Sequence, residues 1–158
     1  MPWRIVFVCT GNICRSPTAE GVLRRMAAVQ GLAGRIEVAS AGLEDWHVGA
    51  PPDVRSQVHA QRRGYALAAL RARHFTPLDF GRFDWVIAMD AGHHARLRRL
   101  CPPQHVHKLR RPADFSTRVP VGGVPDPYFG DAGGFERVLD LIEAVCEGVL
   151  AEVGRLGA

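Results

Sequence analysis

The stretch at residues 8–17, VCTGNICRSP, lies between an apolar run and a segment with helical periodicity. The preceding run, WRIVFV at residues 3–8, is short and rich in β-branched and aromatic residues, which is typical of a buried strand. The pair Ser16-Pro17 favours a helix start, with Ser16 as N-cap and Pro17 at the first helical position. A strand, a tight loop and a helix N-terminus in this order predict a ligand site at the carboxyl end of the strand.

The loop itself carries groups that bind an anion and groups that attack one. Five residues separate the thiol of Cys9 from the guanidinium of Arg15. Gly11 is expected to supply the unusual backbone conformation that curls the intervening N–H groups into an anion-binding nest. The guanidinium of Arg15 and the positive N-terminal end of the helix both point into this nest. The planar guanidinium matches the spacing of two phosphate oxygens. These groups, with the Ser16 hydroxyl, also favour a thiolate at Cys9, so we predict phosphate bound above a cysteine nucleophile. The predicted phosphate-binding residues are Thr10, Gly11, Asn12, Ile13, Cys14 and Ser16.

Apolar runs and helical patterns alternate along the rest of the chain. Strands are expected at residues 36–42, 84–89 and 105–109, and helices at 17–30, 53–63, 90–100 and 135–156, with irregular structure at 110–134. This alternation predicts an α/β fold, a single-domain three-layer sandwich over residues 1–158 with a central four-stranded parallel sheet and helices on both faces. The length of 158 residues suits one domain.

Composition and charge restrict the class of protein. The first apolar run is too short for a signal peptide, and no stretch approaches the roughly 18 apolar residues of a membrane span. We therefore expect a cytoplasmic protein without membrane association, although export without a signal would leave no trace. The net charge is +4, with basic residues clustered between 93 and 111. Because no aromatic residues interleave with these charges, a solvated face or a field attracting a phosphorylated partner is favoured over nucleic-acid binding.

The chain has four cysteines, at positions 9, 14, 101 and 146. A zinc site usually takes two close pairs of ligands, and only Cys9 and Cys14 form one, so neither a metal nor another cofactor is expected. Two interpretations of Cys14 remain open. It packs under the loop, or it closes a reversible disulfide with Cys9 after peroxide has oxidised Cys9. Cys101 and Cys146 are interpreted as structural.

Four segments carry a resemblance to a known family. VCTGNICRSPTAE resembles the signature of the low-molecular-weight protein tyrosine phosphatases, above all their bacterial branch. SAGLEDWHVGAPPD (40–53), DWVIAMD (84–90) and VPDPYFGD (124–131) extend it in the family's order. The resemblance implies hydrolysis of phosphotyrosine in proteins through a cysteinyl-phosphate, with Cys9 as nucleophile, Arg15 binding phosphate and Asp126 as general acid.

The resemblance also implies supporting roles. Asn12 would hold the shape of the loop, Ser16 would support the thiolate, and the cleft would be walled by Trp46, Tyr128 and Phe129. The chain departs from the family at Phe129, where a second tyrosine is usual. Leu70 stands near the place of a common histidine, and a common asparagine is replaced around His93. Relatives that act on phosphoarginine tend to carry a smaller, polar residue where this chain has Ile13, so Ile13 favours tyrosine.

The residues themselves support Asp126 as the acid. Cleavage of a phosphate ester must protonate a leaving oxygen, and Pro127 biases Asp126 toward an extended backbone on a loop with aromatic neighbours. An ordinary turn is the alternative for an Asp-Pro pair, and Asp114 is the second candidate for the acid.

Two other functions share parts of this pattern. Arsenate reduction needs a further close pair of cysteines, whereas Cys101 and Cys146 are far apart in the sequence. A non-catalytic phosphotyrosine-binding module needs neither thiol nor acid. We expect a monomer that acts on tyrosine-phosphorylated proteins and releases inorganic phosphate.

Overall fold

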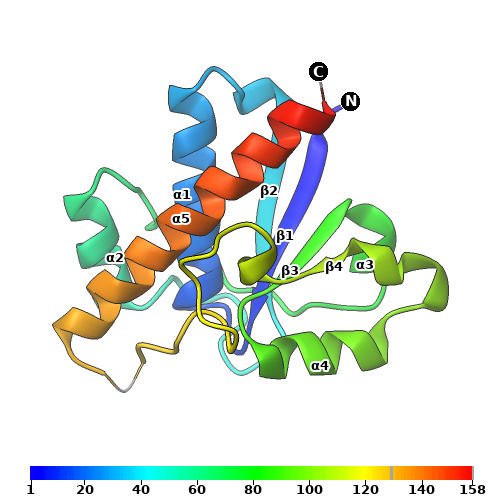
Figure 1. Ribbon diagram of the computed structural model, residues 1–158. Coiled ribbons are helices and arrows are strands. Elements are labelled where there is room, and N and C mark those ends of the chain that lie inside the picture. Colours follow the sequence, from blue (N-terminus) through cyan, green and yellow to red (C-terminus); the bar gives the residue numbers. More distant parts are fainter. Residues whose placement is uncertain (129, 158) are drawn as a thin grey trace.

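The computed structural model describes residues 1–128 and 130–157. Its four parallel strands form one sheet in the order β2-β1-β3-β4 (Figure 1). This parallel sheet with its covering helices confirms the predicted α/β fold. The elements in chain order are β1 (Trp3–Cys9), α1 (Arg15–Val29), η1 (Ala33–Arg35), β2 (Ile36–Gly42), α2 (Val54–Arg62), α3 (Asp79–Arg82), β3 (Trp85–Ala88), α4 (Ala91–Leu100), η2 (Pro103–Lys108), β4 (Leu109–Arg110), η3 (Pro112–Asp114) and α5 (Ala132–Leu156), where η marks a 3₁₀ helix.

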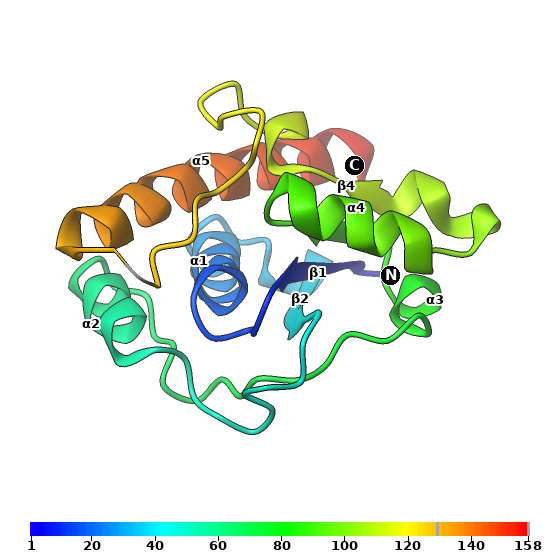
Figure 2. The same ribbon diagram turned by 90° about the horizontal axis from the view of Figure 1, so that it is seen from below.

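Strand β1 separates two apolar cores. Ile5 and Phe7 belong to the core that includes apolar side chains of α1 and α5, and Val6 and Val8 belong to the core shared with α3 and α4. Figure 2 shows α1 on one side of the strands and α3 on the other. Since residues 5–9 of β1 are buried on both faces, this part of the strand is a continuous apolar run instead of an alternating one.

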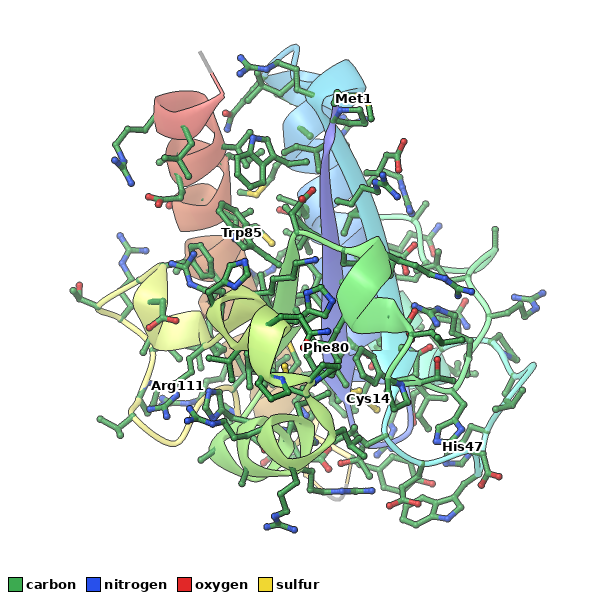
Figure 3. The ribbon with its side chains drawn as sticks, turned by 90° about the vertical axis from the view of Figure 1, so that its right-hand side faces the viewer. Met1, Cys14, His47, Phe80, Trp85 and Arg111 are labelled. Atoms are coloured by element: carbon green, nitrogen blue, oxygen red, sulfur yellow. The ribbon has the colours of Figure 1, made fainter. Side chains whose placement is uncertain are left out.

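The parallel register brings the carboxyl ends of the strands to one edge. Cys9, the last residue of β1, pairs with Gly42, the last residue of β2. Figure 2 looks onto this edge. Cys14 and His47 lie at this end of the sheet, and Met1 lies at the opposite end (Figure 3). The loop after β1 therefore lies where a ligand site is expected in such a sheet.

The start of α1 differs from the prediction. The helix begins at Arg15 with Cys14 as its N-cap, so the predicted Ser16 cap is wrong. The hydroxyl of Ser16 instead lies 2.9 Å from Cys9 Sγ, inside the loop that precedes the helix. Helices α2 and α4 are capped by aspartates, because Asp53 accepts from Arg55 N and Asp90 accepts from His93 N.

Two further segments were predicted incorrectly. Residues 105–109, predicted as a strand, lie mostly in η2, which follows Pro102 and leaves only Leu109 and Arg110 to pair with β3. Residues 110–134, predicted to be irregular, include η3 and the first turn of α5. Helix α5 starts at Ala132 because Asp131 caps it by accepting from Gly134 N. The short helix α3 was not predicted.

Candidate active site

The loop between β1 and α1 turns at one left-handed residue. That residue is Asn12, with φ of 59°, and not Gly11, as the sequence had suggested. Asparagine tolerates this conformation better than most residues, and here its side chain fixes it. Asn12 Nδ2 donates to Ser16 Oγ at 2.7 Å and to Ser40 Oγ at 2.9 Å, while Asn12 Oδ1 accepts from Arg73 N at 2.9 Å. The loop is therefore tied to α1, β2 and the segment before α3.

Glycine is needed where β2 passes the loop. A Cβ on Gly42 would lie 2.9 Å from Thr10 O and 3.0 Å from Gly11 C, both of which are backbone atoms. At Gly11, a Cβ would instead meet the ring of His47 at 2.8 Å. Close packing of backbone on backbone explains Gly42, and sequence reasoning did not identify it.

Cys9 lies at the bottom of the loop, with only 3% of its surface exposed. Its Sγ is 2.9 Å from Ser16 Oγ. Because Ser16 Oγ accepts from Asn12, its own hydrogen is left to donate, and Cys9 Sγ is nearer than the alternative acceptor, Ala41 O at 3.4 Å. A hydroxyl donor at this distance stabilises negative charge on the sulfur.

Arg15 is anchored through one end of its guanidinium. Its Nη1 donates to Asp90 Oδ2 at 2.7 Å and to Val124 O at 2.9 Å. Its Nη2 is 3.6 Å from Asp126 Oδ2, and its buried Nε has no hydrogen-bond partner among the described residues. A side chain that is only 3% exposed thus keeps donors available for an oxyanion in the loop.

A buried histidine connects the anchor of Arg15 to the loop. His93 Nε2 lies 2.8 Å from Thr10 Oγ1, and His93 Nδ1 lies 3.2 Å from Asp90 Oδ1. Burial lowers the pKa of His93 to about 4 despite the neighbouring Asp90 charge, so the ring is neutral at pH 7. Burial alone would raise the pKa of Asp90, but hydrogen bonds from His93 N and Arg15 hold it below its usual range. Sequence reasoning assigned no function to Asp90 or His93.

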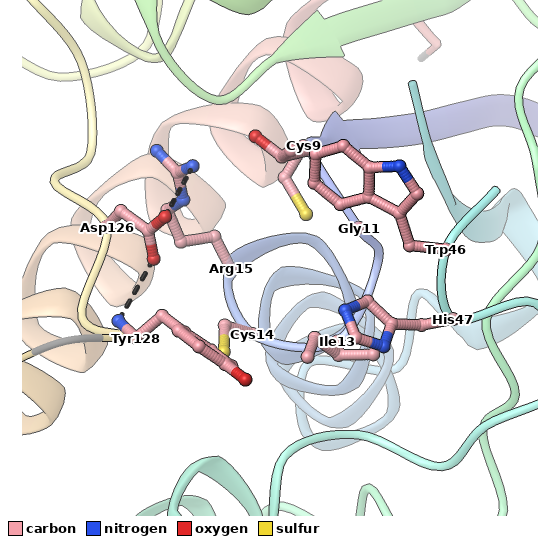
Figure 4. A pocket seen from close by; sticks show the side chains of 10 residues that line it. Cys9, Gly11, Ile13, Cys14, Arg15, Trp46, His47, Asp126 and Tyr128 are labelled. Atoms are coloured by element: carbon pink, nitrogen blue, oxygen red, sulfur yellow. Dashed lines mark hydrogen bonds and ion pairs between the residues drawn. The ribbon is translucent and has the colours of Figure 1, made fainter. Parts of the chain in front are cut away.

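A cavity of about 290 Å³ lies at the carboxyl end of β1, above Cys9 and Arg15 (Figure 4). Most of the predicted site residues come together here, whereas Asn12 and Ser16 are buried and do not line the cavity, and Phe129 lies outside the described residues. His47, which sequence reasoning missed, also lines the cavity. The lining residues are Cys9, Thr10, Gly11, Ile13, Cys14, Arg15, Trp46, His47, Asp126 and Tyr128.

Asp126 lies at the mouth of the cavity. Its Oδ1 accepts from Tyr128 N at 3.0 Å, and the carboxylate faces Arg15 (Figure 4). The rings of Trp46 and Tyr128 lie on opposite sides of the opening, and Trp46 is 68% exposed. Asp114, the second candidate for the acid, does not line the cavity and instead accepts from Arg111 N at the start of η3.

The second cysteine of the loop is a neutral thiol. Burial, assisted by the negative charge of Asp53, raises the pKa of Cys14 to about 12. All four cysteines are unpaired, and within residues 1–128 and 130–157 no three His, Cys, Asp or Glu side chains form a group that could hold a metal ion. In the same part of the chain, none of the helices has the length and apolar character needed to cross a membrane.

The structure has a parallel sheet covered by helices and a Cys-x5-Arg loop at the carboxyl end of β1, which is the arrangement from which we predicted a phosphate-binding site. Residues 4–157 match the model of the low molecular weight phosphotyrosine protein phosphatase family. The low molecular weight protein-tyrosine-phosphatase of Streptomyces coelicolor is 44% identical over 156 residues, which cover 97% of this chain and 94% of the relative. The chain therefore belongs to the low molecular weight protein-tyrosine phosphatases.

Solved structures agree with this assignment. A protein tyrosine phosphatase from Entamoeba histolytica superposes with a TM-score of 0.93 at 35% identity, covering 99% of both chains. An arginine phosphatase from Drosophila superposes with a TM-score of 0.85 at 31% identity, covering 94% of this chain and 96% of the other. The same fold is thus present in proteins whose names give different phosphorylated residues.

Proposed function

We propose that this chain, as one phosphatase domain, hydrolyses phosphotyrosine in proteins through a cysteinyl-phosphate intermediate. The observation that carries the proposal is the arrangement of Arg15. Its guanidinium is held by Asp90 and Val124 O at one end, while its Nε is left unpaired among the described residues, beside the loop that begins at Cys9. A buried cation with donors to spare, next to a buried thiol, suits an oxyanion that is bound and attacked in the same place.

In the first displacement, Cys9 Sγ attacks phosphorus and the bond from phosphorus to the phenolic oxygen breaks. The Ser16 hydroxyl, 2.9 Å from the sulfur, stabilises the attacking thiolate. Asp126, at the cavity mouth, gives its proton to the departing oxygen. Arg15 and the loop N–H groups hold the charge on the transferring phosphoryl group.

In the second displacement, water hydrolyses the cysteinyl-phosphate. Asp126, now a carboxylate, takes a proton from the water as its oxygen attacks phosphorus, and the thiolate of Cys9 leaves. Inorganic phosphate is released. Since Arg15, the backbone and the N-terminus of α1 supply the electrostatic stabilisation, we propose neither a metal nor another cofactor.

The cavity walls support tyrosine as the phosphorylated residue. Trp46 and Tyr128 flank the opening with aromatic rings that suit a flat phenyl group, and Ile13 adds a bulky apolar side chain to the lining. The Drosophila arginine phosphatase makes phosphoarginine the alternative to test. We further propose a cytoplasmic monomer that acts on phosphoproteins and does not bind nucleic acid or membranes.

The proposal is tested by turnover of a phosphotyrosine peptide in the presence of EDTA, beside a phosphoarginine peptide of the same sequence. Preferred hydrolysis of the phosphotyrosine peptide supports it, and preference for phosphoarginine contradicts the choice of substrate. Cys9→Ser is expected to abolish turnover and keep phosphate binding. Substantial residual hydrolysis by this variant would exclude the covalent mechanism.

The general acid is tested with two leaving groups. Asp126→Asn is expected to slow the phosphotyrosine peptide far more than p-nitrophenyl phosphate, because p-nitrophenolate needs little protonation to leave. Asp114→Asn is the matched control, since Asp114 also bonds arginine residues but does not line the cavity. Equal slowing of both substrates by Asp126→Asn would show that Asp126 is not the general acid.

The structure gives little support to the rival functions. Cys146 is fully buried and Cys101 does not line the cavity, which argues against a cysteine relay for arsenate. Arsenate-dependent oxidation of a thiol reductant would overturn that conclusion. A binding module would retain phosphotyrosine affinity but release no phosphate.

A further inference from the structure

Arg55, in the first turn of α2, is anchored to the phosphate-binding loop. Its Nε donates to Asp53 Oδ1 at 3.1 Å and its Nη2 donates to Asp53 Oδ2 at 2.9 Å. The backbone N of Asp53 donates in turn to Ile13 O at 2.8 Å. The two-pronged contact fixes the plane of the guanidinium relative to the loop.

The same guanidinium contacts two aromatic rings. Arg55 Cζ lies 5.4 Å from the ring centroid of Tyr128 and 4.9 Å from that of Phe135. Both distances are within the range in which a cation is attracted to the face of an aromatic ring. Tyr128 N donates to Asp126 Oδ1, so the ring that Arg55 contacts belongs to the segment carrying the proposed acid. Arg55, through Asp53, therefore joins the wall at Ile13 to the wall at Tyr128, which are more than 110 residues apart in sequence.

A purely structural role explains these contacts less well. The N-cap of α2 uses the backbone N of Arg55 and the carboxylate of Asp53, so it does not require the arginine side chain. Hydrogen bonds from Arg55 lower the pKa of Asp53, although burial opposes this, so the pair is charged at pH 7. The Arg55 side chain is 46% exposed, and besides the buried Phe135 it contacts Tyr128, which is 36% exposed at the cavity mouth.

We propose that Arg55 is a positioning residue that holds the ring of Tyr128 at the cavity mouth and thereby favours aryl over non-aryl phosphates. The inference rests on the proposed function, because Tyr128 forms a wall of the proposed phosphotyrosine pocket. Arginine suits this role, since it combines a planar fork for Asp53 with a face that stacks on rings. Arg55 does not line the cavity, and it acts on the substrate through Tyr128.

The test compares two phosphorus oxyanions, one of which carries a phenyl group where the other has a hydroxyl group. Dissociation constants for phenylphosphonate and for inorganic phosphate are measured by calorimetry on wild type, Arg55→Ala and Tyr128→Ala, and on the double variant. Arg62→Ala is the matched control, since it removes another exposed arginine from α2. Arg55→Gln, which keeps a polar side chain, guards against a folding defect, and the Tm of each variant is recorded.

Arg55→Ala and Arg55→Gln are expected to weaken phenylphosphonate binding about two- to fivefold, the size of a half-exposed cation–π contact. Phosphate binding should not change in either, and Arg62→Ala should match wild type for both ligands. In the Tyr128→Ala background, removing Arg55 should add no further loss. Unchanged phenylphosphonate affinity, an equal loss for phosphate, or additive losses in the double variant would each overturn the inference. Because binding is measured without turnover, a wild type that binds both ligands and hydrolyses nothing would contradict the proposed function alone.

Discussion

Thr10 Oγ1 and His93 Nε2 lie 2.8 Å apart, which joins the loop between β1 and α1 to α4 across 83 residues of sequence. The other ring nitrogen of His93 faces Asp90, whose second carboxylate oxygen accepts from Arg15. The position of Arg15 and the shape of the loop are therefore linked through one buried imidazole. The neighbouring charges that act on the pKa of His93 are those of Asp90, Arg15, Arg96 and Asp126.

His93 should make the stability of the fold depend on pH. Its pKa is about 4 when folded and near 6.5 when unfolded, so between these values only the unfolded state binds the proton. The free energy of unfolding should therefore fall as pH is lowered from 6.5 to 4, by about 3 kcal/mol more than in His93→Asn. Urea denaturation at pH 7, 5.5 and 4 measures this difference. Parallel pH profiles for the two proteins would contradict the buried, neutral state of His93.

Asp90→Asn should separate the anchoring of Arg15 from the capping of α4. Asparagine is as good an N-cap as aspartate, so any fall in Tm should come from the lost carboxylate partner of the buried Arg15 and not from the cap of α4. The charge-assisted bond to Arg15 Nη1 is lost, and kcat/KM for p-nitrophenyl phosphate should fall about 10- to 100-fold, as expected for a buried hydrogen bond between charged groups. Steady-state kinetics with a parallel melting curve checks both statements. An unchanged kcat/KM would mean that the bond to Val124 O is sufficient to hold Arg15.

Asn12 offers a pair of variants that separate backbone strain from hydrogen bonding. Asn12→Ala and Asn12→Gly both remove the side-chain bonds to Ser16, Ser40 and Arg73 N, but only glycine adopts a φ of 59° without strain. Both should reduce kcat/KM, because Ser16 loses the donor that orients its hydroxyl. Asn12→Ala should be less stable than Asn12→Gly by about 1 kcal/mol in chemical denaturation. Equal stabilities would show that the loop relaxes to a different conformation.

The contrast between Gly11 and Asn12 illustrates what the sequence can predict. The strand, loop and helix order and the pairing of Cys9 with Arg15 follow from local patterns, because periodicity and spacing are local properties. The left-handed backbone conformation was predicted at Gly11 because glycine adopts it without strain. In the structure it occurs at Asn12, where hydrogen bonds with Ser40 and Arg73 N stabilise it.

Long-range contacts likewise explain the other omissions. Ser40 accepts from Asn12 and donates to the buried Glu20, which pairs with Arg24. This network of hydrogen bonds fixes the side chain of Asn12. His47 contributes to the lining only because the segment after β2 folds over Gly11. The local sequence around these residues does not indicate such contacts. The predicted strand at residues 105–109 was wrong for a different reason, since Pro102 and Pro103 favour a 3₁₀ turn over an extended chain.

Cys14 provides the last prediction, which concerns oxidation. Cys9 and Cys14 both line the cavity, and Cys14 is a neutral thiol with a pKa of about 12. We expect peroxide to oxidise Cys9 to a sulfenic acid, after which Cys14 Sγ attacks that sulfur, releases water and forms a disulfide. Dithiothreitol should then restore most of the activity of wild type.

In Cys14→Ser, the sulfenic acid has no partner in the loop and is expected to oxidise further, so recovery should be small. Cys101→Ser serves as the control, because Cys101 lies outside the cavity and should not affect recovery. If wild type and Cys14→Ser recover equally, Cys14 only packs beneath the loop.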